Sequence, residues 1–210
     1  MCGILGFFGN PENDPPEHII KSMSDSLCHR GPDMYGVWSD TDSHIYFGHR
    51  RLSIIDLSED GSQPMTSQNG RYTLIYNGEI YNFQTLRNDL KEQRISFKGH
   101  SDTEVLLYCI EVYGLEETLQ KIRGMFAFAV WDSHEKSLHL ARDHFGKKPL
   151  YIGWAGKCLV FASELKPIMT HPDFQKRDSS QLHYIHTPYL ILIHLQTFLF
   201  HQQRKAQYEP

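Results

Sequence analysis

An apolar, glycine-rich run with a cysteine at its head follows Met1 directly. Residues 2–9 read Cys-Gly-Ile-Leu-Gly-Phe-Phe-Gly, which predicts a buried strand at the start of the chain. Removal of Met1 would give Cys2 a free α-amino group beside its thiol. A free thiol titrates near ~8.5 and an α-amine near ~7.7–8.0, so part of the amine is neutral at cellular pH and can accept a proton. Cys2 is therefore either a nucleophile that carries its own base or an inert cysteine of a buried strand.

The composition is that of a soluble globular protein without a nucleic-acid or membrane partner. The 210 residues suit one large domain, with 40% hydrophobic and 22% charged residues. The formal net charge is -4 and no stripe of lysine or arginine is present, which argues against binding to nucleic acid. The longest apolar run, residues 189–200, is interrupted by polar residues and is shorter than the about 20 residues that span a bilayer.

The cysteines are scattered along the chain. Cys2, Cys28, Cys109 and Cys158 form no C-x-x-C pair. This spacing argues against a zinc site and against a disulfide scaffold. We therefore expect no metal and a reducing compartment, the cytoplasm.

The hydrophobic pattern predicts many short strands with helices grouped between them. Helices are expected over residues 17–27, 83–93 and 102–113. Residues 61–70 are expected to form a polar loop. Strands are expected over residues 2–9, 35–39, 44–49, 71–76, 126–131, 138–142, 149–153 and 159–162. The strand over 71–76 is expected to end at the Asn-Gly step that follows it. This succession predicts an α+β fold, with helices packed outside antiparallel sheets.

Three further segments carry polar groups that suit a small zwitterion. The pair Arg50-Arg51 precedes an apolar run, and an arginine there could clamp a carboxylate or be a solvated surface residue. The segment from Gly99 to Glu104 supplies a carboxylate at a helix start, behind the expected N-cap Ser101, where it could capture an ammonium group or merely complement the helix dipole. Asn77 and Gly78 could donate an amide and a backbone N–H to an oxyanion, or form a tight turn. Taken together with a thiol, these groups describe a site for a free amino acid with a reactive side-chain carbonyl, and glutamine is the obvious case.

The motifs of the chain resemble those of a known enzyme family. They are Met1-Cys2-Gly3-Ile4, Arg30-Gly31-Pro32-Asp33, Arg51-Leu52-Ser53-Ile54-Ile55-Asp56, Asn77-Gly78-Glu79-Ile80-Tyr81-Asn82, Ser101-Asp102-Thr103-Glu104, Phe126-Ala127-Phe128-Ala129-Val130-Trp131-Asp132, Ala141-Arg142-Asp143, Phe145-Gly146-Lys147-Lys148-Pro149-Leu150-Tyr151 and Phe161-Ala162-Ser163-Glu164. From residue 2 to about residue 170 the chain resembles the class II glutamine amidotransferases, the N-terminal-nucleophile group. It is most similar to the glutaminase half of glutamine-hydrolysing asparagine synthetase. Glucosamine-phosphate synthase and amidophosphoribosyltransferase share the Cys-Gly-Ile start but do not usually carry the Asn-Gly-Glu-Ile-Tyr-Asn form.

The resemblance implies a fold and a set of roles. The fold would be a four-layer α/β/β/α sandwich of two antiparallel sheets, the N-terminal-nucleophile hydrolase fold. Cys2 would attack the side-chain amide of glutamine, and Asn77 and Gly78 would hold the oxyanion. Arg51 would pair with the α-carboxylate of the substrate, while Glu79 and Asp102 would face its α-ammonium. The substrate-binding set implied in this way is Arg51, Leu52, Ser53, Ile54, Ile55, Asn77, Gly78, Glu79 and Asp102.

The chain departs from the family pattern toward its end. It holds no Ser-Gly-Gly-x-Asp-Ser pyrophosphate loop, and residues 179–208 contain no Asp, Glu or Gly. The resemblance therefore implies a glutaminase domain over residues 2–178, an aberrant or truncated tail over 179–210 and no synthetase domain. We expect no cofactor in this chain, since ATP and Mg would serve only the synthetase domain. The expected partners are glutamine, a synthetase domain or chain in trans, and possibly a second copy in a homodimer.

Two other functions stay open on the sequence alone. One is a non-catalytic remnant that keeps the fold without turnover. The other is an amidotransferase that serves a different acceptor, such as a cell-surface glycan.

Overall fold

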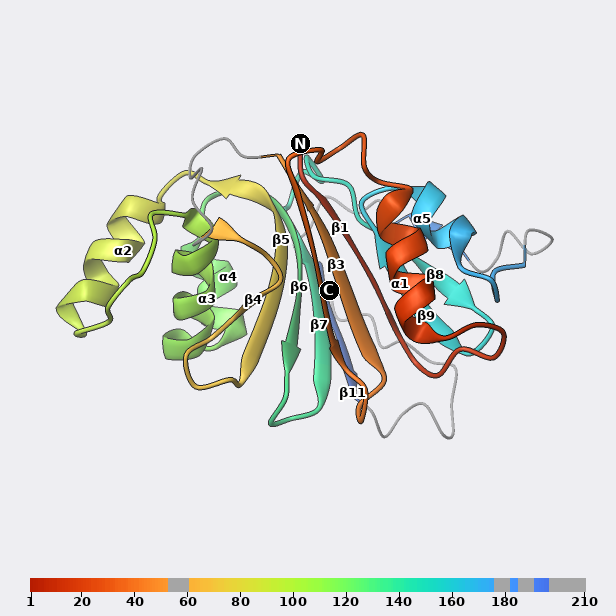
Figure 1. Ribbon diagram of the computed structural model, residues 1–210. Coiled ribbons are helices and arrows are strands. Elements are labelled where there is room, and N and C mark those ends of the chain that lie inside the picture. Colours follow the sequence, from red (N-terminus) through yellow and green to blue (C-terminus); the bar gives the residue numbers. More distant parts are fainter. Residues whose placement is uncertain (53–60, 176–181, 185–190, 197–210) are drawn as a thin grey trace.

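Two antiparallel sheets face each other between two layers of helices (Figure 1). The computed structural model describes residues 1–52, 61–175, 182–184 and 191–196, the last two ranges by their backbone. Within these residues the sheets contain six and five strands, in the orders β10-β8-β9-β1-β3-β2 and β11-β7-β6-β5-β4. The α+β class and the four-layer sandwich expected from the sequence are confirmed.

The six-stranded sheet carries the start of the chain at its centre. Its strands are β1 (Gly3–Phe8), β2 (Met34–Asp40), β3 (Ile45–Arg51), β8 (Tyr151–Ala155), β9 (Cys158–Ala162) and β10 (Leu182–Tyr184). β1 lies between β3 and β9 and is antiparallel to both. Gly3 pairs with Arg50, so Cys2 lies beside the end of β3. The apolar run at the N-terminus is therefore a buried central strand, as the sequence predicts.

The five-stranded sheet contains β4 (Met65–Thr66), β5 (Tyr72–Ile80), β6 (Gly124–Asp132), β7 (Ser137–Arg142) and β11 (Ile191–Gln196). One expectation about this sheet is wrong. β5 does not end at Asn77 and Gly78 but continues through both residues to Ile80, which pairs with Gly124. The Asn-Gly step is thus extended strand rather than a tight turn, because β6 is long enough to pair with it throughout.

Helices cover the outer face of each sheet (Figure 1). The helices α1 (Pro16–Asp25) and α5 (Leu165–Thr170) pack with the outer residues of β1, β3, β8 and β9. On the other side lie α2 (Phe83–Glu92), α3 (Asp102–Tyr113) and α4 (Leu115–Lys121), packed with β5 and β6. The short helix α4 and the short strand β4 have no counterpart in the sequence expectation. Gly114, with a positive φ of 77°, separates α4 from α3.

A second core lies between the two sheets. Residues that point into it include Ile4 and Phe8 of β1, Ile75 of β5 and Trp131 of β6, at alternate positions of their strands. β1 and β5 are in contact across this core. Among the described helices, none is both long and apolar enough to cross a membrane.

The tail expected to be aberrant contributes a strand to each sheet. Leu182–Tyr184 pairs with β8, and Ile191–Gln196 pairs with β7. The sheet edges at β7 and β8 are therefore paired in the described part of the chain. The domain boundary at residue 178 stays a prediction.

Candidate active site

Cys2 lies at the tip of the central strand, against the end of β3. Its Sγ lies 3.6 Å from the carbonyl oxygen of Leu52, to which it donates, and 3.4 Å from the backbone nitrogen of Leu52. The side chain is half-buried. Figure 1 shows the N-terminus at the same end of the sandwich as the last residues of β5. The thiol thus has a defined position and partial access to solvent, as a nucleophile requires.

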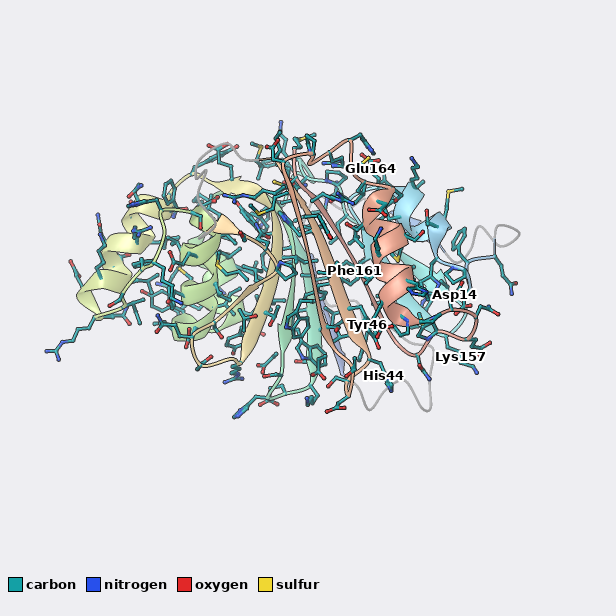
Figure 2. The ribbon with its side chains drawn as sticks, in the orientation of Figure 1. Asp14, His44, Tyr46, Lys157, Phe161 and Glu164 are labelled. Carbon is teal, nitrogen blue, oxygen red and sulfur yellow. The ribbon has the colours of Figure 1, made fainter. Side chains whose placement is uncertain are left out.

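An arginine and a glutamate fix the backbone of Cys2. Arg30 donates from Nε to the carbonyl oxygen of Cys2 at 3.1 Å and from Nη1 to Glu164 at 3.0 Å. Glu164 also contacts His29 at 3.1 Å. It lies at the end of the six-stranded sheet where the N-terminus of the chain is found (Figure 2). Burial pushes the pKa of Glu164 up, but hydrogen bonds from Arg30 and His29 outweigh it and hold the pKa below its ordinary value. Glu164 therefore stays charged and anchors Arg30 against the backbone of Cys2.

The Arg30–Asp33 turn approaches β3 so closely that it requires glycine. A Cβ on Gly31 would lie 2.4 Å from the carbonyl carbon of Arg50, closer than a Cβ comes to an atom to which it is not bonded. The backbone N–H of Asp33 donates to the carbonyl oxygen of Arg51 at 3.2 Å. This close packing places Arg30 beside Cys2, so the turn serves the site as well as the chain reversal.

Asn77 offers a hydrogen-bond donor in the interior. Its side chain is 2% exposed, and it stands two residues beyond Ile75 on the inter-sheet face of β5. Its Nδ2 is buried and has no hydrogen-bond partner among the described residues. An unpaired buried amide costs about 1–3 kcal/mol, so such a group calls for an explanation. A donor held ready for a transient negative charge is such an explanation.

Gly78 follows Asn77 and is enclosed from two sides. A Cβ at this position would lie 2.5 Å from the carbonyl oxygen of Met125 and 2.7 Å from the ring of Tyr76. The close approach of β5 and β6 thus requires glycine here. Glycine is therefore required at position 78 for packing, whether or not its N–H group has a role in the chemistry.

Asp102 stands at the first position of α3, where the expected N-cap is confirmed. Ser101 accepts the backbone N–H of Glu104 at 3.3 Å. Asp102 is buried, and its Oδ2 accepts the hydroxyl of Tyr76 at 2.7 Å and the N–H of Ile80 at 3.0 Å. Burial raises the pKa of the Asp102 carboxyl, and these hydrogen bonds work against the rise. The carboxylate therefore joins the start of α3 to the end of β5.

The remaining expected substrate-binding residues divide into three groups. Arg51 is buried at the end of β3, on the strand face that His49 shares. Glu79 is exposed near the end of β5. Ser53, Ile54 and Ile55 lie outside the described residues. The structure thus brings Cys2, Leu52 and Arg51 together at one end of β1 and β3, and Asn77, Gly78 and Asp102 together at the end of β5.

A buried histidine links the two halves of this region. The ring of His49 hydrogen-bonds to the backbone of Tyr76, and its Nε2 is buried without a partner among the described residues. Burial lowers the pKa of His49 to about 3; the bond to Tyr76 opposes this shift, and the charge of Arg51 adds to it. His49 is therefore neutral at every pH at which the fold is expected to work.

The depressed pKa of His49 predicts acid sensitivity of the fold. The unfolded chain binds a proton at this histidine below about 6.5, whereas the folded chain does so only near 3. Stability should therefore fall as the pH drops through this window, by up to about 1.4 kcal/mol per pH unit from this residue. Denaturant unfolding from pH 7 to pH 4.5 should show a shallower slope for His49→Gln than for the parent. The exposed His44 provides the matched control, since His44→Gln should keep the parent slope. Equal slopes for all three proteins would contradict the prediction.

One cluster away from this region has ligand-type side chains. Cys158, His171 and Asp173 are buried, and their ligand atoms lie within 4.8 Å of one another. Lys157, the neighbour of Cys158, lies at the end of the six-stranded sheet remote from the N-terminus (Figure 2). His171 Nδ1 accepts the N–H of Asp173, and Asp173 Oδ2 accepts the N–H of Glu12, whereas His171 Nε2 is buried without a partner among the described residues. Burial also raises the pKa of the Cys158 thiol to about 12, which keeps it protonated. These contacts are those of a packed core.

Several side chains that organise the site have no role in the sequence expectation. Arg30 begins the motif Arg30-Gly31-Pro32-Asp33, yet nothing in the sequence indicates that it bonds to Cys2. Tyr76 precedes the Asn-Gly step and joins Asp102. Lys148 is buried and directs Nζ toward Sδ of Met1 at 3.6 Å. Such partners are distant in sequence, and a single chain carries no signal of their pairing.

A cysteine that heads a central strand, in a sandwich of two sheets between helical layers, is typical of N-terminal-nucleophile hydrolases. The family model described as "Glutamine amidotransferase domain" matches residues 1–205, and the chain belongs to this family. Asparagine synthetase [glutamine-hydrolyzing] 1 of Bacillus subtilis (strain 168) is 44% identical over 172 residues, which are 80% of this chain and 27% of that protein. Asparagine synthetase [glutamine-hydrolyzing] 3 of Arabidopsis thaliana is 41% identical over 170 residues, which are 80% and 28%. The chain thus spans about a quarter of the length of these curated relatives.

A solved structure extends the likeness at the level of the fold. The glutamine phosphoribosylpyrophosphate amidotransferase from B. subtilis, complexed with ADP and GMP, superposes with a TM-score of 0.73 and 22% identity. The match covers 98% of this chain and 50% of that one. At this identity the likeness shows the shared fold.

Proposed function

We propose that the chain hydrolyses glutamine to glutamate and ammonia, with Cys2 as nucleophile after removal of Met1. The observation that carries the proposal is the pairing of two features at one end of the sandwich. Cys2 Sγ is held by the backbone of Leu52, and the facing strand β5 offers the buried amide of Asn77, whose Nδ2 has no partner among the residues that the structure describes. The match to the glutamine amidotransferase family supplies the substrate.

The reaction follows from these positions. The α-amine of Cys2 takes the thiol proton, and Sγ attacks the side-chain amide carbon of glutamine. Asn77 Nδ2 and the N–H of Gly78 donate to the oxyanion that forms. The C–N bond then breaks, the α-amine passes its proton to the leaving nitrogen, and ammonia departs from a thioester. Water hydrolyses the thioester, which releases glutamate and restores the thiol. These steps use no metal or organic cofactor.

The polar groups around this centre suit the backbone atoms of the substrate. Arg51 would pair with the α-carboxylate, because a guanidinium matches a carboxylate with two parallel hydrogen bonds. Glu79 and Asp102 would receive the α-ammonium. Leu52 would line the pocket, together with the segment from Ser53 to Ile55.

The fate of the ammonia is a separate part of the proposal. Several relatives carry the name asparagine synthetase, and the chain spans about a quarter of their length. We infer that the ammonia serves the amidation of aspartate by a synthetase domain or a synthetase chain acting in trans. ATP and Mg would act there. A homodimer and a cytoplasmic location stay predictions.

Two measurements on one sample test the proposal. Met1 is exposed, so an aminopeptidase can reach the bond that follows it. Mass spectrometry of the expressed chain should show the loss of Met1, and the same sample should release glutamate from glutamine. A chain that keeps an uncleaved N-terminal tag is the matched control and should be inactive, because its Cys2 has no free amine. Glutamate release by the tagged chain at the same rate, or none by the processed chain, would overturn the proposal.

A further inference from the structure

Tyr76 is hydrogen-bonded to several residues of the candidate site and its surroundings, through both its backbone and its hydroxyl. It lies in β5 directly before Asn77 and is 3% exposed. Its backbone N–H donates to Gln63 Oε1 at 2.6 Å, and the His49 ring hydrogen-bonds to its backbone. Its hydroxyl donates to Asp102 at 2.7 Å. A tyrosine with all these groups engaged has one well-defined position.

The hydroxyl of Tyr76 helps to fix Asp102 at the start of α3. Two donors meet on the same carboxylate oxygen, Oδ2: the Tyr76 hydroxyl and the N–H of Ile80 at 3.0 Å. Both of these donors belong to β5, and the backbone N–H groups of Asp102 and Thr103 at the start of α3 also donate to the carboxylate. Oδ1 carries neither of these two bonds.

The hydroxyl also favours the charged form of this carboxyl. Burial raises the pKa of Tyr76 well above its ordinary value, and the charge of Asp102 adds to the rise, so the phenol stays a donor. Burial raises the pKa of Asp102, and the bonds from Ile80 and Tyr76 work against it. Removing the hydroxyl would leave a buried carboxylate with one fewer donor. The remaining carboxylate would be both less firmly oriented and less readily ionised.

The ring of Tyr76 lies close to the oxyanion donor. Its Cε2 would stand 2.7 Å from a Cβ built on Gly78, so the ring packs directly against the Gly78 backbone. After burial and Asp102, the charges of Glu79 and then of Cys2 also raise the pKa of Tyr76, the contribution of Cys2 being the smallest. Tyr76 therefore borders the amine end and the reacting end of the proposed substrate position.

We propose that Tyr76 is a positioning residue which, through its hydroxyl, orients the Asp102 carboxylate to receive the α-ammonium of the amino-acid substrate. This inference rests on the proposed glutamine hydrolysis. It assigns to the hydroxyl a part in selecting substrates that carry an α-amine. The ring keeps the separate task of packing against Gly78.

The variant Tyr76→Phe isolates the hydroxyl, because it keeps the ring. We expect KM for glutamine to rise about tenfold, the effect of a weakened charge-assisted contact, while kcat stays within about twofold. Tyr72→Phe is the matched control: it lies on the same face of β5, its hydroxyl bonds to Asp132, and it belongs to the same core cluster. Its steady-state constants should equal those of the parent.

A substrate without the amine separates positioning from a general structural effect. The probe is 4-carbamoylbutanoate, which is glutamine without its α-amino group. Tyr76→Phe should lower kcat/KM for glutamine about tenfold and leave that of the probe within about twofold, because the probe has no ammonium for Asp102 to receive. An equal loss on both substrates, or an unchanged KM for glutamine, would overturn the inference. No glutamate release by the processed parent would instead overturn the proposed function, so the two failures are distinguishable.

Discussion

Replacing Cys2 by serine is expected to reduce glutamate release at least about a thousandfold, because a hydroxyl yields its proton far less readily than a thiol. The change replaces the sulfur atom by a smaller and less polarisable oxygen and alters the side-chain volume little. Within the described structure, the sulfur of Cys2 hydrogen-bonds to the backbone of Leu52, and a hydroxyl can make the same kind of bond, so the fold should tolerate the oxygen. The unfolding temperature should therefore stay close to that of the parent while turnover is lost. Near-parent turnover by Cys2→Ser would end the assignment of Cys2 as nucleophile.

Covalent labelling gives this prediction a second readout. A glutamine analogue with a diazoketone in place of its side-chain amide should alkylate Cys2 and add its mass to the N-terminal peptide. Cys28 is exposed, whereas Cys109 and Cys158 are buried, so Cys28→Ser is the matched control. That control should keep both labelling and activity. Labelling of Cys28 in preference to Cys2 would show that the analogue reacts with any accessible thiol.

The layers of the fold could be predicted because the hydrophobic pattern records them. Residues 2–9 are apolar without alternation, and β1 is indeed buried on both faces, against α1 on one side and the second sheet on the other. The helix over 102–113 matches α3, and its N-cap Ser101 is where the sequence places it. Strong periodicity and a capping residue are local signals, so a single sequence contains them.

The errors fall where distant pairing decides the structure. An Asn-Gly step favours a turn locally, yet β6 pairs with β5 through Asn77 and Gly78, and this pairing prevails. The two-residue strand β4 has too few residues to show a pattern. The tail after residue 178 shows weak periodicity, but parts of its backbone pair with β7 and β8.

The candidate site shows the same division. Cys2 and Asn77 are recognisable because their chemistry is unusual at their positions in the chain. The supporting contacts are not recognisable, since Arg30 meets Glu164 across 134 residues and Tyr76 meets Asp102 across 26. Their tasks become visible only when the strands are assembled.

Replacing Asn77 by alanine is expected to lower kcat about 10²–10³-fold with little change in KM, since the amide would act on the oxyanion and not on bound glutamine. The loss corresponds to about 3–4 kcal/mol of barrier. Steady-state kinetics on the processed chain measure both constants. A kcat near that of the parent would remove Asn77 from the oxyanion site, and a large rise in KM with constant kcat would assign it to substrate binding.

The thermal stability of Asn77→Ala provides a second, independent test of this role. Asn77 Nδ2 is buried without a partner in the described structure, so its removal relieves an unpaired polar group instead of breaking a hydrogen bond. Thermal unfolding of Asn77→Ala should therefore occur at the same temperature as the parent or above it, while turnover falls. Thr73→Ala is a suitable comparison, because Thr73 is also buried on β5 but its hydroxyl hydrogen-bonds to Thr66 at 3.0 Å. That variant should lose stability and keep its kcat. Opposite responses at two buried polar residues of one strand are expected only if Asn77 is retained for its chemistry, since a group kept for the fold would cost stability when removed.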